Sequence, residues 1–143
     1  MLHIIPFHLI YPEEIGCHIL VDAKVNDIPA KFIIDTGASN TVMDMSRIEK
    51  FVVSPNMVLS ESMSASVGSS NLTSHVLIIN QLSIDTFSVR DYMLILMDLS
   101  HINHVFTSLK LGEVDGILGG DLFLKYKAKI DYKYKTLTFR TRN

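Results

Sequence analysis

Apolar and polar residues alternate along most of this chain, with the period of two that is typical of β-strands packed on a core. Turn-forming residues separate the alternating segments, and Asn26-Asp27 joins two of them into a hairpin. Residues 87–97 change from alternation to a continuous apolar run, which predicts a core strand. The full pattern predicts strands at residues 15–25, 28–34, 41–43, 72–81, 87–97, 113–118, 128–132 and 136–139.

Two short helical segments are expected between these strands. Ser46 is placed to cap a helical turn over residues 47–51, with Glu49 at its third position as in a capping box. A second short helix is expected to open at Gly119 and to extend to Tyr126. The chain is therefore predicted to be all-β with short helices.

Residues 98–111 have no regular pattern and are expected to form an irregular connection. His101 and His104 lie in this segment, close to Asp98. Their spacing suits metal ligands only on a helix, and no cysteine or His-Glu-x-x-His motif accompanies them. We therefore expect no metal site.

The composition favours a compact domain with little polar surface, or one that covers part of its surface with a partner. Of the 143 residues, 48% are hydrophobic and 20% are charged, and the mean hydropathy is +0.27. This length suits a single domain over residues 1–143. A net charge of −2, a pI near 6.3 and the lack of any basic run argue against nucleic acid as a partner.

Signals for secretion or membrane insertion are not seen in the sequence. The first ten residues lack a basic start and are interrupted by Pro6, unlike a signal peptide. The longest apolar run, residues 92–97, is far shorter than the roughly 20 residues that cross a bilayer. Cys17 is the only cysteine, and we expect a buried, inert thiol in a strand. These observations predict a cytoplasmic protein without membrane contact.

One carboxylate stands at the end of an apolar strand. Residues 32–39 read Phe-Ile-Ile-Asp-Thr-Gly-Ala-Ser, so Asp35 is followed by a hydroxyl and a glycine, and a sharp turn there can present the acid to a cleft. Residues 114–119, Val-Asp-Gly-Ile-Leu-Gly, form another apolar strand closed by glycine. The sequence has no P-loop, dinucleotide-binding glycine pattern or Gly-x-Ser-x-Gly motif, so other enzyme classes gain little support.

The order and spacing of these two motifs resemble the retropepsin-like aspartic proteases, the single-lobe branch similar to retroviral proteases. The resemblance covers about residues 15–140. It implies a closed β-barrel like one acid-protease lobe, with one or two short helices and a two-fold homodimer. A pseudo-symmetric lobe of this family would show hairpin, strand, turn and short helix twice, as we read them at residues 15–51 and 87–126. The first dozen residues have no clear counterpart and are expected to add a strand at the dimer edge.

The resemblance also implies an aspartic-type endopeptidase that hydrolyses a peptide or protein substrate without a cofactor. This chemistry needs two carboxylates that share one proton, one acting on water and one on the substrate carbonyl. The chain has a single Asp-Thr-Gly, and Asp115 lacks the following hydroxyl, so Asp35 of two subunits must form the dyad. Two alternatives stay open: an inactive peptide-binding or dimerisation module of the same fold, and a precursor domain active only in a larger assembly.

The resemblance assigns supporting roles to the residues after Asp35. Thr36 would reach across the dyad to the backbone of the other subunit. Gly37 would let the backbone approach the dyad and the substrate. Ala38 and Ser39 would lie next to the bound peptide, and Ala38 gives the dyad no further hydroxyl.

A second set of residues is expected to support this turn from behind: Ile117, Leu118 and Gly119. Ser39 and Gly120 depart from the retroviral pattern, which often has an acid at the first position and an arginine at the second. The internal ion pair of those relatives is therefore absent, along with its contribution to the dimer and to substrate binding.

A mobile hairpin, or flap, closes over the substrate in proteins of this kind. The polar and small residues around Gly68 have the composition of a hairpin tip, and an ordinary exposed loop is the alternative. The candidate flap residues are Ser66, Val67, Gly68, Ser69, Ser70 and Asn71.

Overall fold

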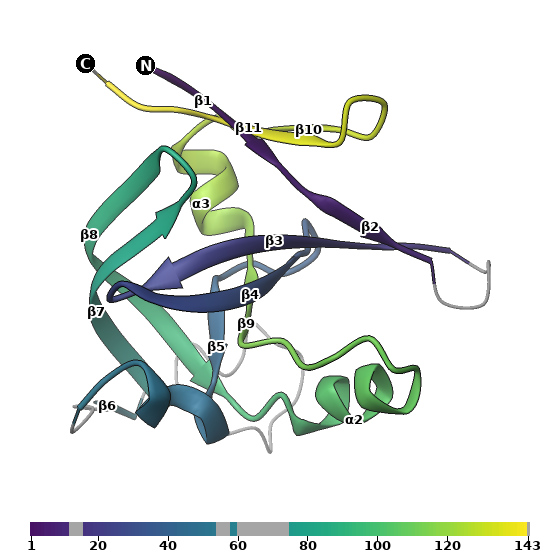
Figure 1. The fold of residues 1–143 in the computed structure, drawn as a ribbon. Helices are drawn as coiled ribbons and strands as arrows, with labels where there is room; N and C mark the ends of the chain where they lie inside the picture. The colour runs from purple at the N-terminus through teal and green to yellow at the C-terminus, as the bar shows by residue number, and fades with distance from the viewer. Residues whose placement is uncertain (12–15, 54–57, 60–74, 143) are drawn as a thin grey trace.

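The computed structural model describes residues 1–11, 16–53, 58–59 and 75–142. The main body is a closed barrel, in which neighbouring strands pair in the order β3-β4-β9-β5-β8-β7 and β7 pairs again with β3 (Figure 1). The six barrel strands are β3 (His18–Val25), β4 (Ile28–Ile34), β5 (Val42–Asp44), β7 (His75–Ile84), β8 (Phe87–Met97) and β9 (Gly116–Leu118). The all-β closed barrel expected from the sequence is confirmed.

The barrel has an internal pseudo-symmetry. Strand β4 runs parallel to β9, β5 runs parallel to β8, and β5 and β9 pair antiparallel between them. Hairpin β3–β4, strand β5 and the 3-10 helix η2 (Met45–Lys50) thus correspond to hairpin β7–β8, strand β9 and helix α3 (Gly120–Lys125). The second unit begins at His75, not at residue 87 as we expected, because β7 is the first strand of the second hairpin.

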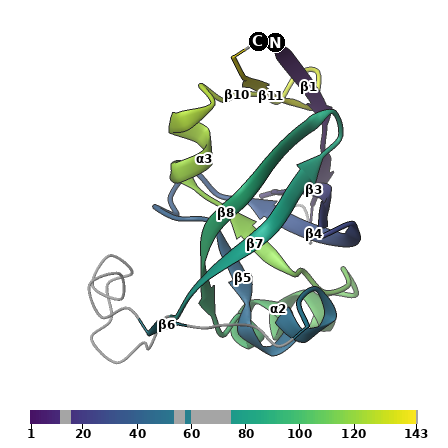
Figure 2. The ribbon, with the colours of Figure 1, turned by 90° about the vertical axis from the view of Figure 1, so that its left-hand side faces the viewer.

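A separate three-stranded sheet lies at one end of the barrel, next to α3 (Figure 2). It consists of β1 (Leu2–Pro6), β11 (Thr136–Arg140) and β10 (Lys129–Asp131), in that order. The short β2 (His8–Ile10) then pairs with β3, and β6 (Val58–Leu59) pairs with β7. The first ten residues therefore form two strands that pair within this chain, and Figure 1 shows both termini side by side.

An aromatic cluster connects this sheet to the barrel. The ring of Phe87 on β8 lies 4.6 Å from that of Phe139 on β11 and 4.9 Å from that of Tyr126, which follows α3 (distances between ring centroids). Phe87 and Phe139 are fully buried. Each such contact adds about 0.5–1.5 kcal/mol beyond burial, so the cluster fixes α3 against both sheets.

The helix after β5 has a different cap from the one we predicted. Asp44 is the N-cap of η2, and its carboxylate accepts a hydrogen bond from the backbone N–H of Ser46. The prediction that Ser46 caps a helix over residues 47–51 was wrong because the helix begins earlier, directly at the end of β5. Asp44 is also the better cap here because it is buried and accepts further donors.

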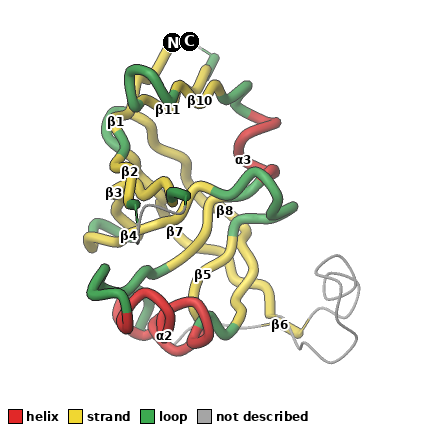
Figure 3. Tube along the Cα trace, turned by 90° about the vertical axis from the view of Figure 1, so that its right-hand side faces the viewer, coloured by secondary structure: helices red, strands yellow, loops and turns green. Residues whose placement is uncertain are grey.

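An α-helix, α2 (Ser100–Ser108), occupies the segment expected to be irregular, so that expectation was also wrong. Nine residues are too few for a stable isolated helix, and tertiary contacts supply the stability. Phe106 packs with Leu20, Ile33 and Val114, and Asn103 is buried. Helices α2 and α3 lie at opposite ends of the barrel (Figure 3).

Two smaller expectations also need correction. Cys17 is exposed, because it precedes β3 instead of lying within it. Strand β9 begins at Gly116, not at residue 113, since Val114 and Asp115 bond to neighbouring segments outside any ladder. No helix among the described residues has the length and apolar character needed to cross a membrane.

Candidate active site

Asp35 lies at the point where β4 leaves the barrel. Phe32, Ile33 and Ile34 before it are buried, whereas Asp35 is exposed. Its backbone N–H still donates to the carbonyl of Leu118 on β9, at 3.1 Å. The main chain of Asp35 is therefore attached to the barrel, while the carboxylate faces solvent.

A tight turn follows Asp35 and orients its side chain. The backbone N–H of Gly37 donates to Asp35 Oδ1 at 2.9 Å, and the N–H of Ala38 donates to the Asp35 carbonyl at 3.1 Å. A Cβ added to Gly37 would lie only 3.2 Å from Asp35 Oδ1, so glycine allows this close approach of backbone to carboxylate. Thr36 and Gly37 are exposed beside the acid, as is Ser39.

The segment from β9 into α3 runs along the back of this turn. Besides the bond from Asp35 to Leu118, the N–H of Gly120 donates to the Ala38 carbonyl at 2.7 Å. The N–H of Asp121 donates to the Ser39 carbonyl at 3.1 Å. We call residues 118–121 the strap, because they bond to the Asp35 turn along most of its length.

Gly119 is the point of closest packing between strap and turn. A Cβ at Gly119 would lie 2.5 Å from the carbonyl oxygen of Asn40 and 2.9 Å from that of Ala38, distances that no side chain tolerates without a backbone shift. A Cβ at Gly120 would lie 3.4 Å from the Ala38 oxygen, which is ordinary contact. Close packing therefore requires a glycine at position 119 but not at position 120.

Three polar residues behind the turn were not singled out as site residues in the sequence. Thr41 is completely buried, and its Oγ1 accepts from the Gly119 N–H at 3.1 Å and donates to Asp121 Oδ1 at 2.8 Å. The hydroxyl of Tyr92 on β8 donates to Asp121 Oδ2. Burial and the neighbouring Asp121 raise the pKa of Tyr92 well above its ordinary value, so the phenol stays a donor. The sequence could indicate that a hydroxyl group in or beside a buried strand needs a hydrogen-bond partner, but it could not identify that partner.

The remaining predicted residues divide into two groups. Ile117 and Leu118 lie on β9 opposite Ile33 and Ile34 of β4, and Leu118 is fully buried. All candidate flap residues, 66–71, lie outside the described part of the chain.

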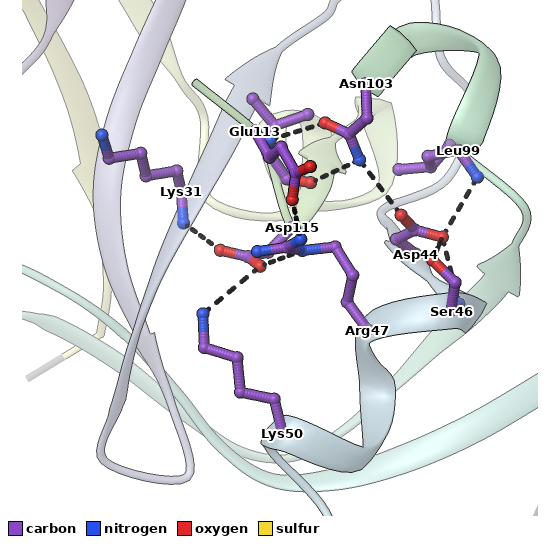
Figure 4. Close-up of polar contacts among 10 residues, drawn as sticks. Lys31, Asp44, Ser46, Arg47, Lys50, Leu99, Asn103, Glu113 and Asp115 are labelled. Atoms are coloured by element: carbon purple, nitrogen blue, oxygen red, sulfur yellow. Dashed lines mark hydrogen bonds and ion pairs between the residues drawn. The ribbon is translucent and has the colours of Figure 1, made fainter. Parts of the chain in front are cut away.

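Asp115 has no place at this turn. Its buried carboxylate accepts from the Lys31 N–H at 2.9 Å and from Arg47 Nε at 2.7 Å, and it lies 3.8 Å from Lys50 Nζ (Figure 4). Arg47 also pairs with Glu113. The hydrogen bond to Asp115 raises the pKa of Arg47, so the guanidinium stays charged. This network connects η2 to the barrel and leaves Asp115 no open position for a substrate.

A second buried carboxylate lies in the same part of the molecule. Asp44 accepts from the Leu99 N–H at 3.2 Å and from Asn103 Nδ2 at 3.1 Å, in addition to its bonds with Ser46 (Figure 4). Asn103 in turn exchanges hydrogen bonds with both backbone groups of Val114. These bonds hold α2 against the end of the barrel.

The two histidines of α2 are both exposed. His101 and His104 lie on a helix after all, so the geometric reason given for rejecting them as a pair was wrong. No group of three or more His, Cys, Asp or Glu side chains in the described ranges is arranged to hold a metal ion.

Comparison with solved structures finds the same fold. The chain is similar to a retropepsin-like aspartic protease from Rickettsia conorii, with a TM-score of 0.57, 18% identity and coverage of 97% of this chain and 88% of that one. It is also similar to the retroviral protease-like domain of Ddi1 from Leishmania major, with a TM-score of 0.58, 17% identity and coverage of 87% and 89%. At such identities the likeness concerns the fold alone.

Sequence comparison adds the family. No curated protein matches the chain. A family profile described as aspartyl protease, however, matches residues 21–122, well over half of the chain. The matched range runs from β3 into α3 and includes both the Asp35 turn and the strap. The chain belongs to the aspartyl protease family.

Proposed function

We propose that this chain is an aspartic endopeptidase, active as a homodimer in which Asp35 of each subunit supplies one carboxylate of the catalytic dyad. The observation that carries the proposal is the exposed Asp35 carboxylate, held at the end of β4 by the Gly37 N–H and followed by the small residues of the turn. The family match and the barrel fold support it.

The need for two chains follows from the number of available acids. The sequence has one Asp-Thr-Gly. Asp115, which precedes the Ile-Leu-Gly of β9, is buried among Arg47, Lys50 and the Lys31 backbone. A two-fold arrangement of identical turns brings a second Asp35 to the first without any further acid from the same chain.

In this dimer the two carboxylates share one proton, because two adjacent negative charges repel each other. The ionised acid removes a proton from a water molecule, and the resulting oxygen attacks the scissile carbonyl carbon. The protonated acid gives its proton to the carbonyl oxygen. The C–N bond of the tetrahedral intermediate then breaks as a proton passes to the leaving nitrogen, which yields a carboxylic acid and an amine.

The neighbours of Asp35 take supporting parts in the proposal. The Gly37 N–H stabilises the carboxylate by a charge-assisted hydrogen bond. Ala38 and Ser39 would lie next to the bound peptide, and Thr36, which is exposed, would reach across the dyad to the partner subunit.

Cleavage of an unstructured protein at about pH 4–6, measured together with solution mass over a dilution series, tests the proposal. Specific activity should fall as the dimer dissociates, and a chelator should leave it unchanged. Peptide binding without cleavage at any concentration would indicate the alternative, an inactive binding or dimerisation module. Constant specific activity in solutions that contain only monomers would contradict the shared dyad.

A further inference from the structure

The side chains behind the Asp35 turn form a continuous chain of hydrogen bonds from β8 to the strap. Tyr92 donates to one oxygen of Asp121, and Thr41 donates to the other at 2.8 Å. Thr41 then accepts from the Gly119 N–H at 3.1 Å. Both carboxylate oxygens of Asp121 act as acceptors here.

The direction of the Thr41 hydroxyl matters for this arrangement. A hydroxyl has one proton, and that of Thr41 points to Asp121. Its lone pairs are therefore free to accept the Gly119 N–H, which would otherwise be a buried donor. Asp121 thus determines the orientation that Thr41 needs in order to hold Gly119.

Gly119 connects the Thr41 hydroxyl to the Asp35 turn. It packs against the carbonyls of Ala38 and Asn40 with no room for a Cβ, and its neighbours in the strap bond to Asp35 and Ala38. A shift of Gly119 by a fraction of an ångström must therefore move the turn that carries Asp35. Catalytic geometry is sensitive to such shifts, since a misplacement of about 1 Å costs roughly 100-fold in rate.

We propose that Thr41 and Asp121, supported by Tyr92, are positioning residues that fix the Asp35 turn through the strap. The proposal rests on the function proposed above, because it concerns the placement of the same carboxylate. The three side chains act through Gly119 and its neighbours, since they form hydrogen bonds with one another and with the strap.

The chain offers a control at the other end of the barrel. The hydroxyl of Ser46 donates to the buried carboxylate of Asp44 at 3.0 Å, the same type of bond as that from Thr41 to Asp121. Asp44 bonds to α2 and η2, not to the strap. Removal of the Ser46 hydroxyl tests whether any lost hydroxyl–carboxylate bond lowers activity.

The experiment measures kcat and KM for Thr41→Val, Thr41→Ser, Tyr92→Phe and Ser46→Ala. Thr41→Val should lower kcat by about 100-fold and change KM by much less, because the displaced turn carries the reacting carboxylate but only part of the peptide cleft. Thr41→Ser keeps the hydroxyl and should restore most of kcat. Tyr92→Phe leaves Thr41 in place and should give a smaller loss in kcat, and Ser46→Ala should give none.

Amide hydrogen exchange at Gly37 and Ala38 provides a readout that needs no activity and applies to Tyr92→Phe even if Thr41→Val fails to fold. Faster exchange at these amides in Thr41→Val or Tyr92→Phe, but not in Ser46→Ala, supports the positioning role. Unchanged exchange and unchanged kcat in both variants would overturn it. If wild-type protein cleaves no better than Asp35→Asn, the proposed endopeptidase fails, while the exchange data still decide whether the network positions the turn.

Discussion

The two ends of the barrel carry the same local feature with different surroundings. Strand β4 is followed by Asp35 and strand β8 by Asp98, and each exposed carboxylate accepts a hydrogen bond from the backbone N–H two residues later, at 2.9 Å. After Asp35 the chain makes a turn of small residues and enters β5; after Asp98 it enters α2. An acid at the end of an apolar strand is thus an ordinary product of this pseudo-symmetric fold.

The difference lies in what supports each acid. The Asp35 turn is bonded along its back by the strap, which leaves its front open. At the other end, the buried carboxylates of Asp44 and Asp115 accept hydrogen bonds from η2, α2 and the adjoining strands. None of the ion pairs in the described residues involves Asp35. The comparison indicates that buried carboxylates hold the Asp98 end together, whereas the exposed carboxylate of Asp35 stands on a turn that the strap supports from behind.

The largest expected effect separates the two strand-end acids. Asp35→Asn should lower cleavage by roughly 1,000-fold or more, because the dyad loses the ionised group that acts on water. Asp98→Asn changes an equally exposed acid with the same turn geometry and should leave kcat unchanged. Steady-state kinetics on both variants checks this, and equal losses in the two would remove the distinction between the ends.

The next effect concerns stability at the end that carries Asp115. Arg47→Met removes the guanidinium that donates to this buried carboxylate, and should lower the free energy of unfolding by about 2–4 kcal/mol. Lys50 and the Lys31 N–H remain as partners, which limits the loss. Urea unfolding measures it. The folded variant should keep its kcat, and a loss of kcat without a loss of stability would mean that this end takes part in catalysis.

A smaller effect tests the strap with two adjacent glycines. Gly119→Ala places a Cβ 2.5 Å from the Asn40 carbonyl and should lower the free energy of unfolding by about 1–3 kcal/mol, together with kcat. Gly120→Ala places its Cβ 3.4 Å from the Ala38 oxygen, where it fits. Thermal unfolding and kinetics should therefore show a far larger loss of stability and of kcat in Gly119→Ala than in Gly120→Ala. Equal tolerance at both positions would show that the strap yields without disturbing the turn.

The smallest effect is a pH dependence at Asp98. The backbone N–H and hydroxyl of Ser100 lower the pKa of this carboxyl group. A pKa lowered in the folded state gives stability that is present above about pH 4, the unfolded value, and is lost as the pH falls through the folded value. Wild type should therefore show a slight stability advantage over Asp98→Asn at neutral pH that shrinks in acid. Parallel stability curves for the two proteins would contradict this.

The sequence predicted the barrel well where strands are bounded by clear turns. Strands β4 and β8 begin and end at the predicted residues, because their apolar runs follow turn pairs such as Asn26-Asp27 and end at acids. Helix α2 was missed because its stability comes from distant partners: Asn103 bonds to Asp44, and Phe106 packs on Leu20. The pattern of apolar and polar residues within the segment itself does not indicate such long-range contacts.

The candidate site was predictable in its acid but not in its support. The motif identified Asp35 and the small residues after it. Thr41 and Asp121 are 80 positions apart, and neither is unusual in its own segment, so only the fold brings the two together. Strap and turn meet because β9 pairs parallel to β4, a long-range arrangement that strand patterns do not specify.

The most direct test of the central claim, a dyad shared by two chains, is to mix wild type with Asp35→Asn. The two proteins are unfolded and refolded together with a threefold excess of the variant, and native mass spectrometry verifies mixed dimers. If each site needs Asp35 from both subunits, activity per wild-type chain should fall to about one quarter, the random share of wild-type partners. An equal excess of an unrelated protein should leave the activity unchanged. Full activity per wild-type chain in verified mixed dimers would contradict the account.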